Sequence, residues 1–396
     1  METKNVTRRD FIKIASAAGV GSVLSTGQVL AQVAAEPAPA TLPARAFGKT
    51  GVKVPMLALG GIFDIVANQL VLQRALDFGV TYWDTANGYT NGNSEKGIGM
   101  YFEKHPEVRK GIFLVSKAGT HDPARLSEML EESLRRMKTD YIDLYFLHGI
   151  GRGEDLTPDV KAWAEKAKAS NKIRFFGFST HGNMENSLQA AAKLGWIDGI
   201  MLKYDFRLMS TNNMRAATEA CANAGIGLTA MKTQGGGPLR AETAADLKLG
   251  GHFIKRGFTD KQAKLKAVWD NSQIAAICSQ MSSVTVLESN VAAAHDKTKL
   301  TAADRAALHR YALETHSQFC AGCTHLCEPA AGRAPIGDAL RCLMYHRIYG
   351  DPGLAQETFA GLARPAGNVD YTAAEAVCPQ RLPIARLMRE ASALLG

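Results

Sequence analysis

Four polar side chains of different chemical types follow apolar runs along this chain. Asp84 and Tyr89 lie in YWDTANGY, Lys117 lies in IFLVSKAG, and His148 lies in DLYFLHG. If each apolar run is a strand of a parallel α/β barrel, these side chains emerge at the carboxyl ends of strands, where such barrels build their active sites. A carboxylate, a phenol, an ammonium group and an imidazole gathered there can deliver a proton to a carbonyl oxygen.

The chemistry expected of this group is the neutralisation of charge on a carbonyl that is being reduced. Hydride attack leaves negative charge on the oxygen, and an adjacent O–H must neutralise it. The phenol of Tyr89 is a weak acid with an ordinary pKa of ~10, and we expect the ammonium group of Lys117 to lower that pKa. We expect Asp84 to hold Lys117 in place and His148 to orient the carbonyl. Four unrelated polar residues are the alternative, but their shared position at strand ends favours one site.

The elements that must position these residues alternate in type along the chain. Eight apolar runs of strand length are separated by segments of helical period, which indicates a parallel sheet covered by helices. Eight such units in about 250 residues are typical of a (β/α)8 or TIM barrel. The expected strands lie within residues 54–61, 81–86, 111–119, 142–149, 173–180, 198–205, 226–233 and 274–281. Because GxGxxG does not follow the first run, we do not expect a Rossmann-type nucleotide site.

From Phe47 to Ala294 the chain resembles the aldo/keto reductase family. The most specific matches are FGKTGVKVPMLALGG, FGVTYWDTANGY, VSKAG, DYIDLYFLHG and GFSTH. The resemblance implies a (β/α)8 barrel and hydride transfer between a nicotinamide cofactor, NADP or NAD, and a small aldehyde or ketone. It also assigns the family's catalytic roles to four residues of this chain, namely Asp84, Tyr89, Lys117 and His148.

The family's cofactor-binding positions carry over less completely. The resemblance implies contacts to the nicotinamide cofactor from Ser179, Thr180, Met231 and Asn290. Thr180 stands where the family usually has Asn, and Met231 where it often has an aromatic residue, although Met can also cover a ring face. Met201 replaces the family's Gln on the sixth strand.

The residues that would bind a 2′-phosphate also depart from the family pattern. NADP-dependent members carry Lys and Arg at positions that read Gln280 and Val286 here, and a phosphate without a cation loses its strongest contact. The choice between NAD and NADP therefore stays open. Cations near the expected barrel mouth could substitute, and backbone amides of the Gly235–Pro238 turn could approach a pyrophosphate. These cations are Lys203, Arg207 and Lys232.

Five of the seven cysteines fall after residue 319. Cys320, Cys323 and Cys327 form CxxCxxxC, and Cys378 precedes a proline. This pattern resembles the ligand set of ferredoxins, and one branch of the aldo/keto reductases carries such a domain after its barrel. The resemblance implies a small, mainly α-helical, ferredoxin-like domain in which these four cysteines hold one [4Fe–4S] cluster.

Other interpretations of these thiols remain open. The third gap of the motif is one residue longer than in the common CxxCxxC. Cys342 is a rival fourth ligand, although core packing is its more ordinary role. His325 lies between the cysteines, so a zinc site is an alternative, with either four cysteine ligands or three cysteines and a histidine. Structural disulfides are a further alternative.

The amino-terminal segment predicts export. TRRDFIK, with Arg8 and Arg9, resembles the twin-arginine (Tat) signal, and the following stretch is too short and weakly apolar to form a stable membrane anchor. We therefore expect a signal peptide at 1–35, a linker at 36–45, the barrel at 46–300 and a helical cysteine-containing domain at 301–396. The Tat machinery would be a partner and the periplasm the destination. The net charge of +8 is scattered, which argues against nucleic-acid binding.

Two functions are compatible with these features. The first is an exported carbonyl reductase whose iron–sulfur cluster accompanies the reaction or exchanges electrons with a partner protein. The second is an iron–sulfur electron-transfer or binding module on a catalytically retired reductase barrel. The substrate itself depends on loops after the strands, whose shapes the sequence does not define, and the oligomeric state is equally undefined.

Overall fold

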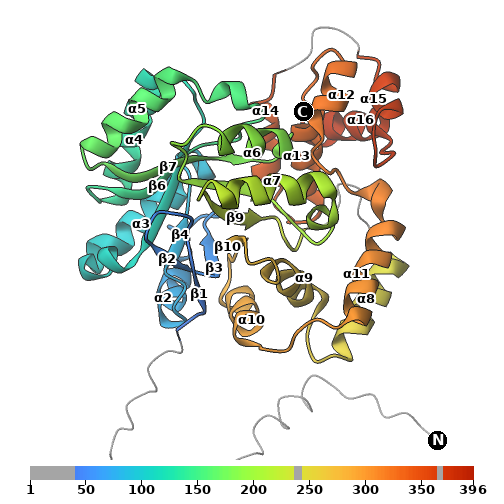
Figure 1. Cartoon of the computed structure of the whole chain (residues 1–396), viewed down its shortest axis with the longest axis horizontal. Helices are drawn as coiled ribbons and strands as arrows, with labels where there is room; N and C mark the ends of the chain where they lie inside the picture. The colour runs from blue at the N-terminus through green and yellow to red at the C-terminus, as the bar shows by residue number, and fades with distance from the viewer. Residues whose placement is uncertain (1–40, 236–242, 364–368) are drawn as a thin grey trace, which may run out of the picture. The chain divides into compact units, whose positions relative to one another are not determined.

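Eight parallel strands close into a barrel in chain order, from β3 to β10 (Figure 1). The structure is a computed structural model and describes residues 41–235, 243–363 and 369–396. Each expected apolar run contains one strand, so the predicted (β/α)8 barrel is confirmed. The strands are β3 Leu57–Gly60, β4 Tyr82–Asp84, β5 Phe113–Ala118, β6 Ile142–Leu147, β7 Ile173–Thr180, β8 Gly199–Lys203, β9 Gly227–Met231 and β10 Ile274–Gln280.

Helices between the strands form the outer layer of the barrel. They are α2 Gln69–Asp77, α3 Asn93–Lys104, α4 Pro123–Met137, α5 Pro158–Ala169, α6 Met184–Ala192, α7 Asn212–Asn223, α8 Ala244–Ile254, α9 Asp260–Trp269 and α10 Val284–His295. Between β9 and β10, the sequence predicted one helix, which corresponds to α9. The structure adds α8, which begins with a capping box between Thr243 and Asp246.

Helix α4 illustrates how the sequence defines these elements. Asp122 caps its amino terminus by accepting a hydrogen bond from the Ala124 amide at 3.2 Å, with a proline at the first helical position. Its apolar residues Leu126, Leu130 and Leu134 recur every four positions and are buried. They form the face that packs on the barrel beside β5, the strand that carries Lys117. Replacing Leu126 by Ala should destabilise the fold by about 2–5 kcal/mol.

The amino-terminal end of the barrel is closed by a hairpin. Strands β1 Ala44–Ala46 and β2 Lys53–Pro55 pair antiparallel, and between them Phe47 is fully buried in the barrel interior. A side chain at Gly199 or Gly227 would meet the ring of Phe47 at 2.8 or 2.5 Å. Because Gly199 and Gly227, at the start of β8 and β9, have no side chains, the ring of Phe47 fits between the strands.

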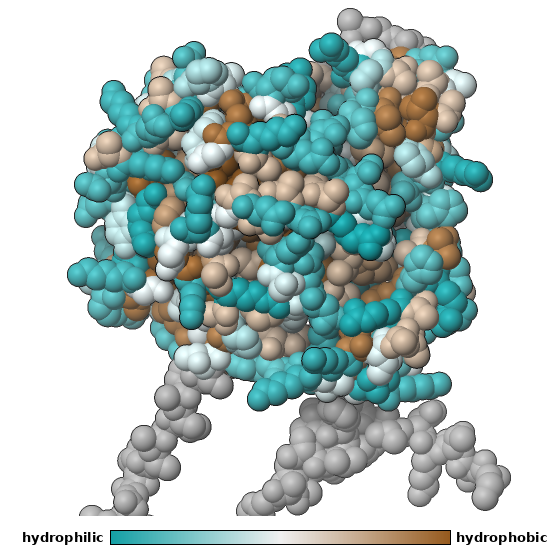
Figure 2. All heavy atoms as spheres, viewed as in Figure 1, coloured by the Kyte–Doolittle hydropathy of each residue, from teal (hydrophilic) through white to brown (hydrophobic). Residues whose placement is uncertain are grey.

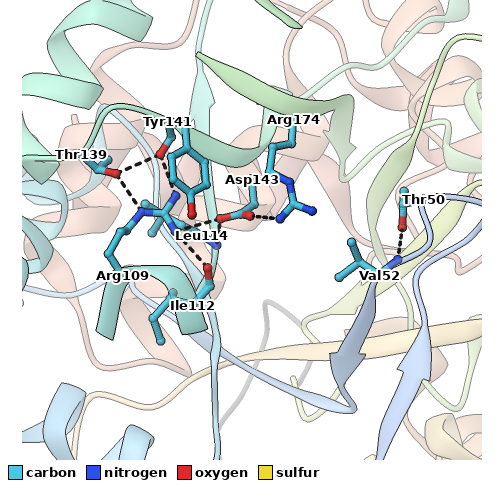
Figure 3. Close-up of polar contacts among 9 residues, drawn as sticks. All are labelled: Thr50, Val52, Arg109, Ile112, Leu114, Thr139, Tyr141, Asp143 and Arg174. Atoms are coloured by element: carbon cyan, nitrogen blue, oxygen red, sulfur yellow. Dashed lines mark hydrogen bonds and ion pairs between the residues drawn. The ribbon is translucent and has the colours of Figure 1, made fainter. Parts of the chain in front are cut away.

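A buried ionic network ties β5, β6 and β7 together near their beginnings (Figure 3). Asp143 accepts hydrogen bonds from Arg109 at 3.0 Å, from Arg174 at 2.6 Å and from the Leu114 amide at 3.0 Å. Arg109 also donates to the carbonyl of Tyr141 and to the hydroxyl of Thr139. This network satisfies a carboxylate that is only 1% exposed, and it lies at the end of the strands opposite Lys117.

The chain after the barrel is helical throughout its described residues. Its elements are α11 Ala302–Glu314, α12 Thr324–Ala330, α13 Ile336–Arg347, α14 Pro352–Ala360, α15 Thr372–Ala376 and α16 Ile384–Leu395. Helix α11 packs on α8, whereas α13–α16 share a separate hydrophobic core that runs from Ala331 to Leu395. We call residues 319–396 the tail. Its helical character is as expected, and its ferredoxin-like nature stays a prediction.

The surface is predominantly polar on the face shown in Figure 2, where hydrophobic side chains are scattered among hydrophilic ones. Within the described ranges, no helix combines the length and the apolar character needed to cross a bilayer.

Candidate active site

The structure brings the four expected catalytic side chains together at the carboxyl ends of the strands. Asp84 is the last residue of β4, Lys117 is in β5, and Tyr89 and His148 follow β4 and β6. The Nζ atom of Lys117 lies 2.7 Å from Asp84 Oδ1 and 3.3 Å from Tyr89 Oη. It also donates to the carbonyl of Thr85 at 2.6 Å. The rings of Tyr89 and His148 meet edge to face, with centroids 5.6 Å apart.

Burial controls the electrostatics of this site. It raises the pKa of Tyr89 well above its usual value, and the negative charge of Asp84 adds to that rise. The expected net lowering of the Tyr89 pKa is therefore wrong, because burial of the phenol is the largest cause of the shift and acts in the opposite direction. Burial also raises the pKa of Asp84, while Lys117 opposes that rise.

His148 is kept neutral at the same site. Burial lowers the pKa of His148 well below its usual value, and the positive charges of Lys117, Arg341 and Lys232 lower it further. A neutral imidazole carries one N–H donor and one acceptor nitrogen. His148 can therefore donate a hydrogen bond to a carbonyl oxygen without carrying a charge.

Helix α13 of the tail contributes residues to this region that the sequence analysis did not assign to the site. Tyr345 Oη lies 3.2 Å from Lys232 Nζ at the end of β9. Arg341 affects the pKa values of both Tyr89 and His148. Arg341 and Tyr345 are four residues apart on α13, so they share one face of the helix, and Tyr349 follows after its end. That spacing was the available signal, but nothing in the sequence indicated that this face meets the barrel.

The residues expected to contact a cofactor lie at or near the same end of the barrel. Ser179 and Thr180 end β7, Met231 ends β9, and all three are buried. Ser179 accepts a hydrogen bond from the Gly149 amide at 3.1 Å. Asn290 on α10 is engaged internally, since it donates to Ser279 at 3.0 Å and accepts from Gln234 at 3.0 Å. Their role in binding a cofactor stays a prediction.

Four cysteines of the tail line one pocket. Cys320, Cys323, Cys327 and Cys378 surround an empty volume of about 340 Å³, which includes space open to solvent. Apolar side chains complete the wall, among them Leu340 and Leu382. Cys342 and His325 are not among the lining residues; Cys342 is buried in the tail core. Cys221 and Cys278 are buried in the barrel, as expected.

The cysteine loop is seated directly on the barrel. The carbonyl of Gly322 accepts a hydrogen bond from the Asn183 amide at 2.6 Å, and Lys203 at the end of β8 donates to the carbonyl of Cys320. Gly322 has a φ of +86°, and a Cβ there would lie 2.4 Å from the carbonyl oxygen of His181. Only glycine allows the loop to approach the barrel this closely.

Other predictions fall outside the described residues. These are the signal peptide at 1–35, the first part of the 36–45 linker, and the glycines and proline of the Gly235–Pro238 turn beyond Gly235. Of the suggested substitutes for a 2′-phosphate partner, Lys203 and Lys232 lie at strand ends. Arg207 instead donates to the carbonyl of Ala312 and to Thr315, where the chain leaves the barrel.

Comparison with known proteins identifies one family. Residues 64–302 match the sequence model of the aldo/keto reductase family. The aldo-keto reductase yakc [NADP(+)] of Schizosaccharomyces pombe is 32% identical over 176 residues, which cover 41% of this chain and 49% of that protein. Methylglyoxal reductase YeaE of Escherichia coli is 37% identical over 110 residues, which cover 27% and 37% of the two chains. The match thus spans about half the length of the first of these relatives.

Solved structures share the barrel. The holo form of the aldo-keto reductase AKR11C1 from Bacillus halodurans superposes with a TM-score of 0.58 at 23% identity, covering 68% of this chain and 96% of that one. An aldo/keto reductase from Klebsiella pneumoniae in complex with NADP and acetate has a TM-score of 0.55 at 24% identity, with coverage of 67% and 94%. At these identities, the similarity shows that the fold is shared.

Proposed function

The chain belongs to the aldo/keto reductase family, and we propose that it reduces a small aldehyde or ketone with a nicotinamide cofactor. The observation that carries this proposal is the buried chain of contacts from Asp84 to Lys117 at 2.7 Å and from Lys117 to Tyr89 at 3.3 Å. It places a phenol, supported by a fixed ammonium group, beside an imidazole at the barrel mouth.

The proposed mechanism assigns one task to each side chain. A bound nicotinamide cofactor would supply the hydride. Tyr89, whose raised pKa keeps the phenol protonated at neutral pH, donates its proton to the carbonyl oxygen. Lys117 then stabilises the phenolate that this transfer leaves, and Asp84 keeps Lys117 charged and oriented. Neutral His148 donates a hydrogen bond that orients the carbonyl.

The residues present fit the nicotinamide end of such a cofactor better than the end that carries the 2′-phosphate in NADP. Ser179 and Met231 lie at the barrel mouth, and Met201 is also buried there in the interior. Gln280 donates to the carbonyl of Ile62 at 3.0 Å, and Val286 is apolar, so neither offers a charge for a 2′-phosphate. We therefore propose that both NAD and NADP are accepted. The NADP in the names of related proteins supports the cofactor class.

A steady-state assay tests the proposal. Purified protein should oxidise NADPH and NADH in the presence of a panel of small aldehydes, with kcat/KM values for the two nucleotides that differ little. Tyr89→Phe removes the donated proton and should lower kcat by about 10²–10⁴. Tyr141→Phe is a matched control, since this ring stacks on Arg109 at the opposite end of the strands. Turnover by Tyr89→Phe at the wild-type rate would contradict the mechanism.

We further propose that the four tail cysteines hold a [4Fe–4S] cluster. Their thiols line one pocket with apolar walls, as a cluster shielded from water requires. Among the described residues, no three metal-binding side chains come close enough together for a single ion. A zinc site is the alternative, and it would need its sulfur ligands at about 2.3 Å from one ion. When bound, the cluster would supply one-electron transfer.

Metal analysis separates the two metals and the two candidate fourth ligands. Protein purified without oxygen should contain about four iron atoms and four acid-labile sulfides per chain, as one such cluster requires. Cys378→Ser should lose most of this iron, whereas Cys342→Ala should retain it, because Cys342 faces the tail core. Stoichiometric zinc in place of iron, or equal loss in both variants, would overturn the assignment.

We also propose that the protein reaches the periplasm by the twin-arginine route. The support is the TRRDFIK sequence with its paired Arg8 and Arg9. This route carries folded proteins, which suits a cofactor inserted in the cytoplasm. Cell fractionation should find the protein in the periplasm, and the Arg8→Lys, Arg9→Lys double variant should remain in the cytoplasm. Unchanged export of this variant contradicts the proposal.

A retired barrel that serves as a binding or electron-transfer module is the second candidate. The observation that favours it is the internal engagement of Asn290 by Ser279 and Gln234, which commits this side chain to partners within the protein rather than to a nucleotide. Under this alternative no aldehyde is reduced with either nucleotide, and Tyr89→Phe changes nothing. The steady-state assay therefore decides between the two functions.

A further inference from the structure

A second pocket lies between the barrel mouth and the tail. The barrel contributes His181 after β7 together with Lys203 and Lys232 at the ends of β8 and β9, and α13 contributes Asp338 and Arg341. Its empty volume is about 470 Å³, including space open to solvent.

The charges that line this pocket are unbalanced. Lys203, Lys232 and Arg341 are cationic, and Asp338 is the one carboxylate among the residues that line it. Arg341 pairs with Asp338 at 2.6 Å. Lys232 contacts the phenol of Tyr345, and Lys203 contacts a backbone carbonyl. Three positive charges against one negative charge leave a net formal charge of +2, which favours an anionic ligand.

The same cations are close enough to influence the catalytic residues. Burial lowers the pKa of His148 first, and Lys117, Arg341 and Lys232 lower it further. Burial and Asp84 raise the pKa of Tyr89, while Arg341 opposes that rise. The pocket residues His181, Lys203 and Lys232 follow or end β7, β8 and β9, so the pocket lies at the end of the barrel that carries Tyr89 and His148.

We propose that this pocket binds the anionic group, a carboxylate or a phosphate, of the carbonyl substrate, and that Arg341 of the tail determines this specificity. The proposal rests on the proposed reductase function and names its substrate class. A guanidinium group suits the role because it can form two parallel hydrogen bonds to either anion. The tail thereby takes part in substrate selection, since Arg341 lies on α13.

Matched substrate pairs test the proposal. Succinic semialdehyde is compared with butanal, and glyceraldehyde 3-phosphate with glyceraldehyde, which also distinguishes a carboxylate from a phosphate. The wild type should favour at least one charged member in kcat/KM. Arg341→Met should lower that value by roughly 10- to 100-fold, the range expected for a lost charge-assisted hydrogen bond. The neutral partner lacks the anionic group, so its kcat/KM should fall much less in this variant.

Arg386→Met is the matched control. Arg386 lies on α16, is half exposed and pairs with Glu390, so this variant should behave like the wild type with every substrate. Equal loss on charged and neutral substrates in Arg341→Met would overturn the proposal. So would a rise in the KM for NADH or NADPH without a change in substrate preference, because the pocket would then bind the nucleotide.

A binding measurement separates this inference from the reductase proposal. Succinate and inorganic phosphate are titrated calorimetrically into the wild type, Arg341→Met and Lys232→Met. Binding of either anion by the wild type, with weaker binding by both variants, supports the pocket even if no aldehyde is reduced. The Lys232 variant leaves the Arg341–Asp338 pair intact, in case Arg341→Met folds poorly. No binding by the wild type overturns the inference.

Discussion

Lys117 and Asp84 form an ion pair that is almost completely buried, with side chains 1% and 3% exposed. Removing two charges from water is costly, and their attraction repays that cost only when both partners are present. The lysine also donates to the Thr85 carbonyl, so its charge is satisfied from two sides. A pair of this kind is poor evidence for stability and better evidence for a functional requirement.

Breaking this pair on one side should therefore be worse than removing both charges. Lys117→Met leaves the Asp84 carboxylate buried and uncompensated, and should lower the free energy of unfolding by about 3–5 kcal/mol. The Lys117→Met, Asp84→Asn double variant should recover much of that loss. Urea denaturation of the three proteins measures the difference. Additive losses in the double variant would show that the two charges do not depend on each other.

The pH dependence of reduction follows from two opposite shifts. Because the pKa of Tyr89 is raised, its phenol stays protonated even at pH values above its ordinary pKa of about 10. Because the pKa of His148 is lowered, its imidazole stays neutral even at pH values below its ordinary pKa of about 6.5. Reductive kcat should thus be level between those limits and fall on the alkaline side as Tyr89 loses its proton. A fall near pH 7–8 would contradict this pattern.

The sequence predicted the position of the catalytic residues but not all of their surroundings. Asp84, Tyr89, Lys117 and His148 could be identified because strand ends of a barrel converge on one face. The shift of the Tyr89 pKa was predicted in the wrong direction, because the sequence did not show how far this phenol is removed from water. Arg341 is separated from Tyr89 by more than half the chain, and only the folded structure shows that their charges interact.

Among the elements, α11 is capped and linked to α8 by the carboxylate of one residue, Asp304. Asp304 closes the capping box with Thr301 and also bonds His252 at 2.8 Å and Arg256 at 3.3 Å, from α8 and the turn that follows it. Its own burial opposes ionisation, but these hydrogen bonds and Arg256 lower the pKa of Asp304 to about 2. The residue therefore fastens α11 to the barrel in its ionised form.

This shift predicts a pH-dependent stability. Because the folded pKa lies below the ordinary value of about 3.9, the stabilisation is fully present above pH 4 and is lost as the pH falls towards 2. Asp304→Asn should lower the free energy of unfolding by about 1–2 kcal/mol at pH 7, and by less at pH 3. Thermal unfolding at both pH values, with exposed Asp140→Asn as a control, measures this. A deficit that is as large at pH 3 as at pH 7 would contradict the role given to ionised Asp304.

Element types were more predictable than the packing of elements. The eight strands were evident because both faces of a parallel sheet are covered, which makes its strands continuous apolar runs. Helix α8 was not predicted, since its glycines and exposed Leu247 and Ile254 obscure the helical pattern. Nor could the sequence show that α11 packs on α8 while α13–α16 form a core of their own.

Across the molecule, the two pockets share one cysteine. Cys320 lines both the cysteine pocket and the cationic pocket at the barrel mouth, and Lys203 from β8 donates to its carbonyl. A cluster bound by Cys320 would thus be separated from a ligand at the mouth by little more than this cysteine.

The separate tail core predicts how the molecule responds to loss of the cluster. The buried side chains of α13–α16 pack among themselves, so the tail can open while the barrel core stays intact. In Cys378→Ser, limited proteolysis should cut within the tail and leave a resistant barrel fragment that ends near residue 319. Cys342→Ala should resist cleavage as the wild type does. Equal cleavage of barrel and tail in Cys378→Ser would show that they unfold together.

The most direct test of the central claim follows the transferred hydrogen. Protein, a small aldehyde and NADPH or NADH carrying deuterium at the transferable C4 position are mixed, and the alcohol product is analysed by mass spectrometry. We expect one deuterium on the former carbonyl carbon with the wild type and almost no product with Tyr89→Phe. Deuterium-labelled product from both proteins at equal rates would contradict the role of the phenol, and none from either would contradict the reductase function itself.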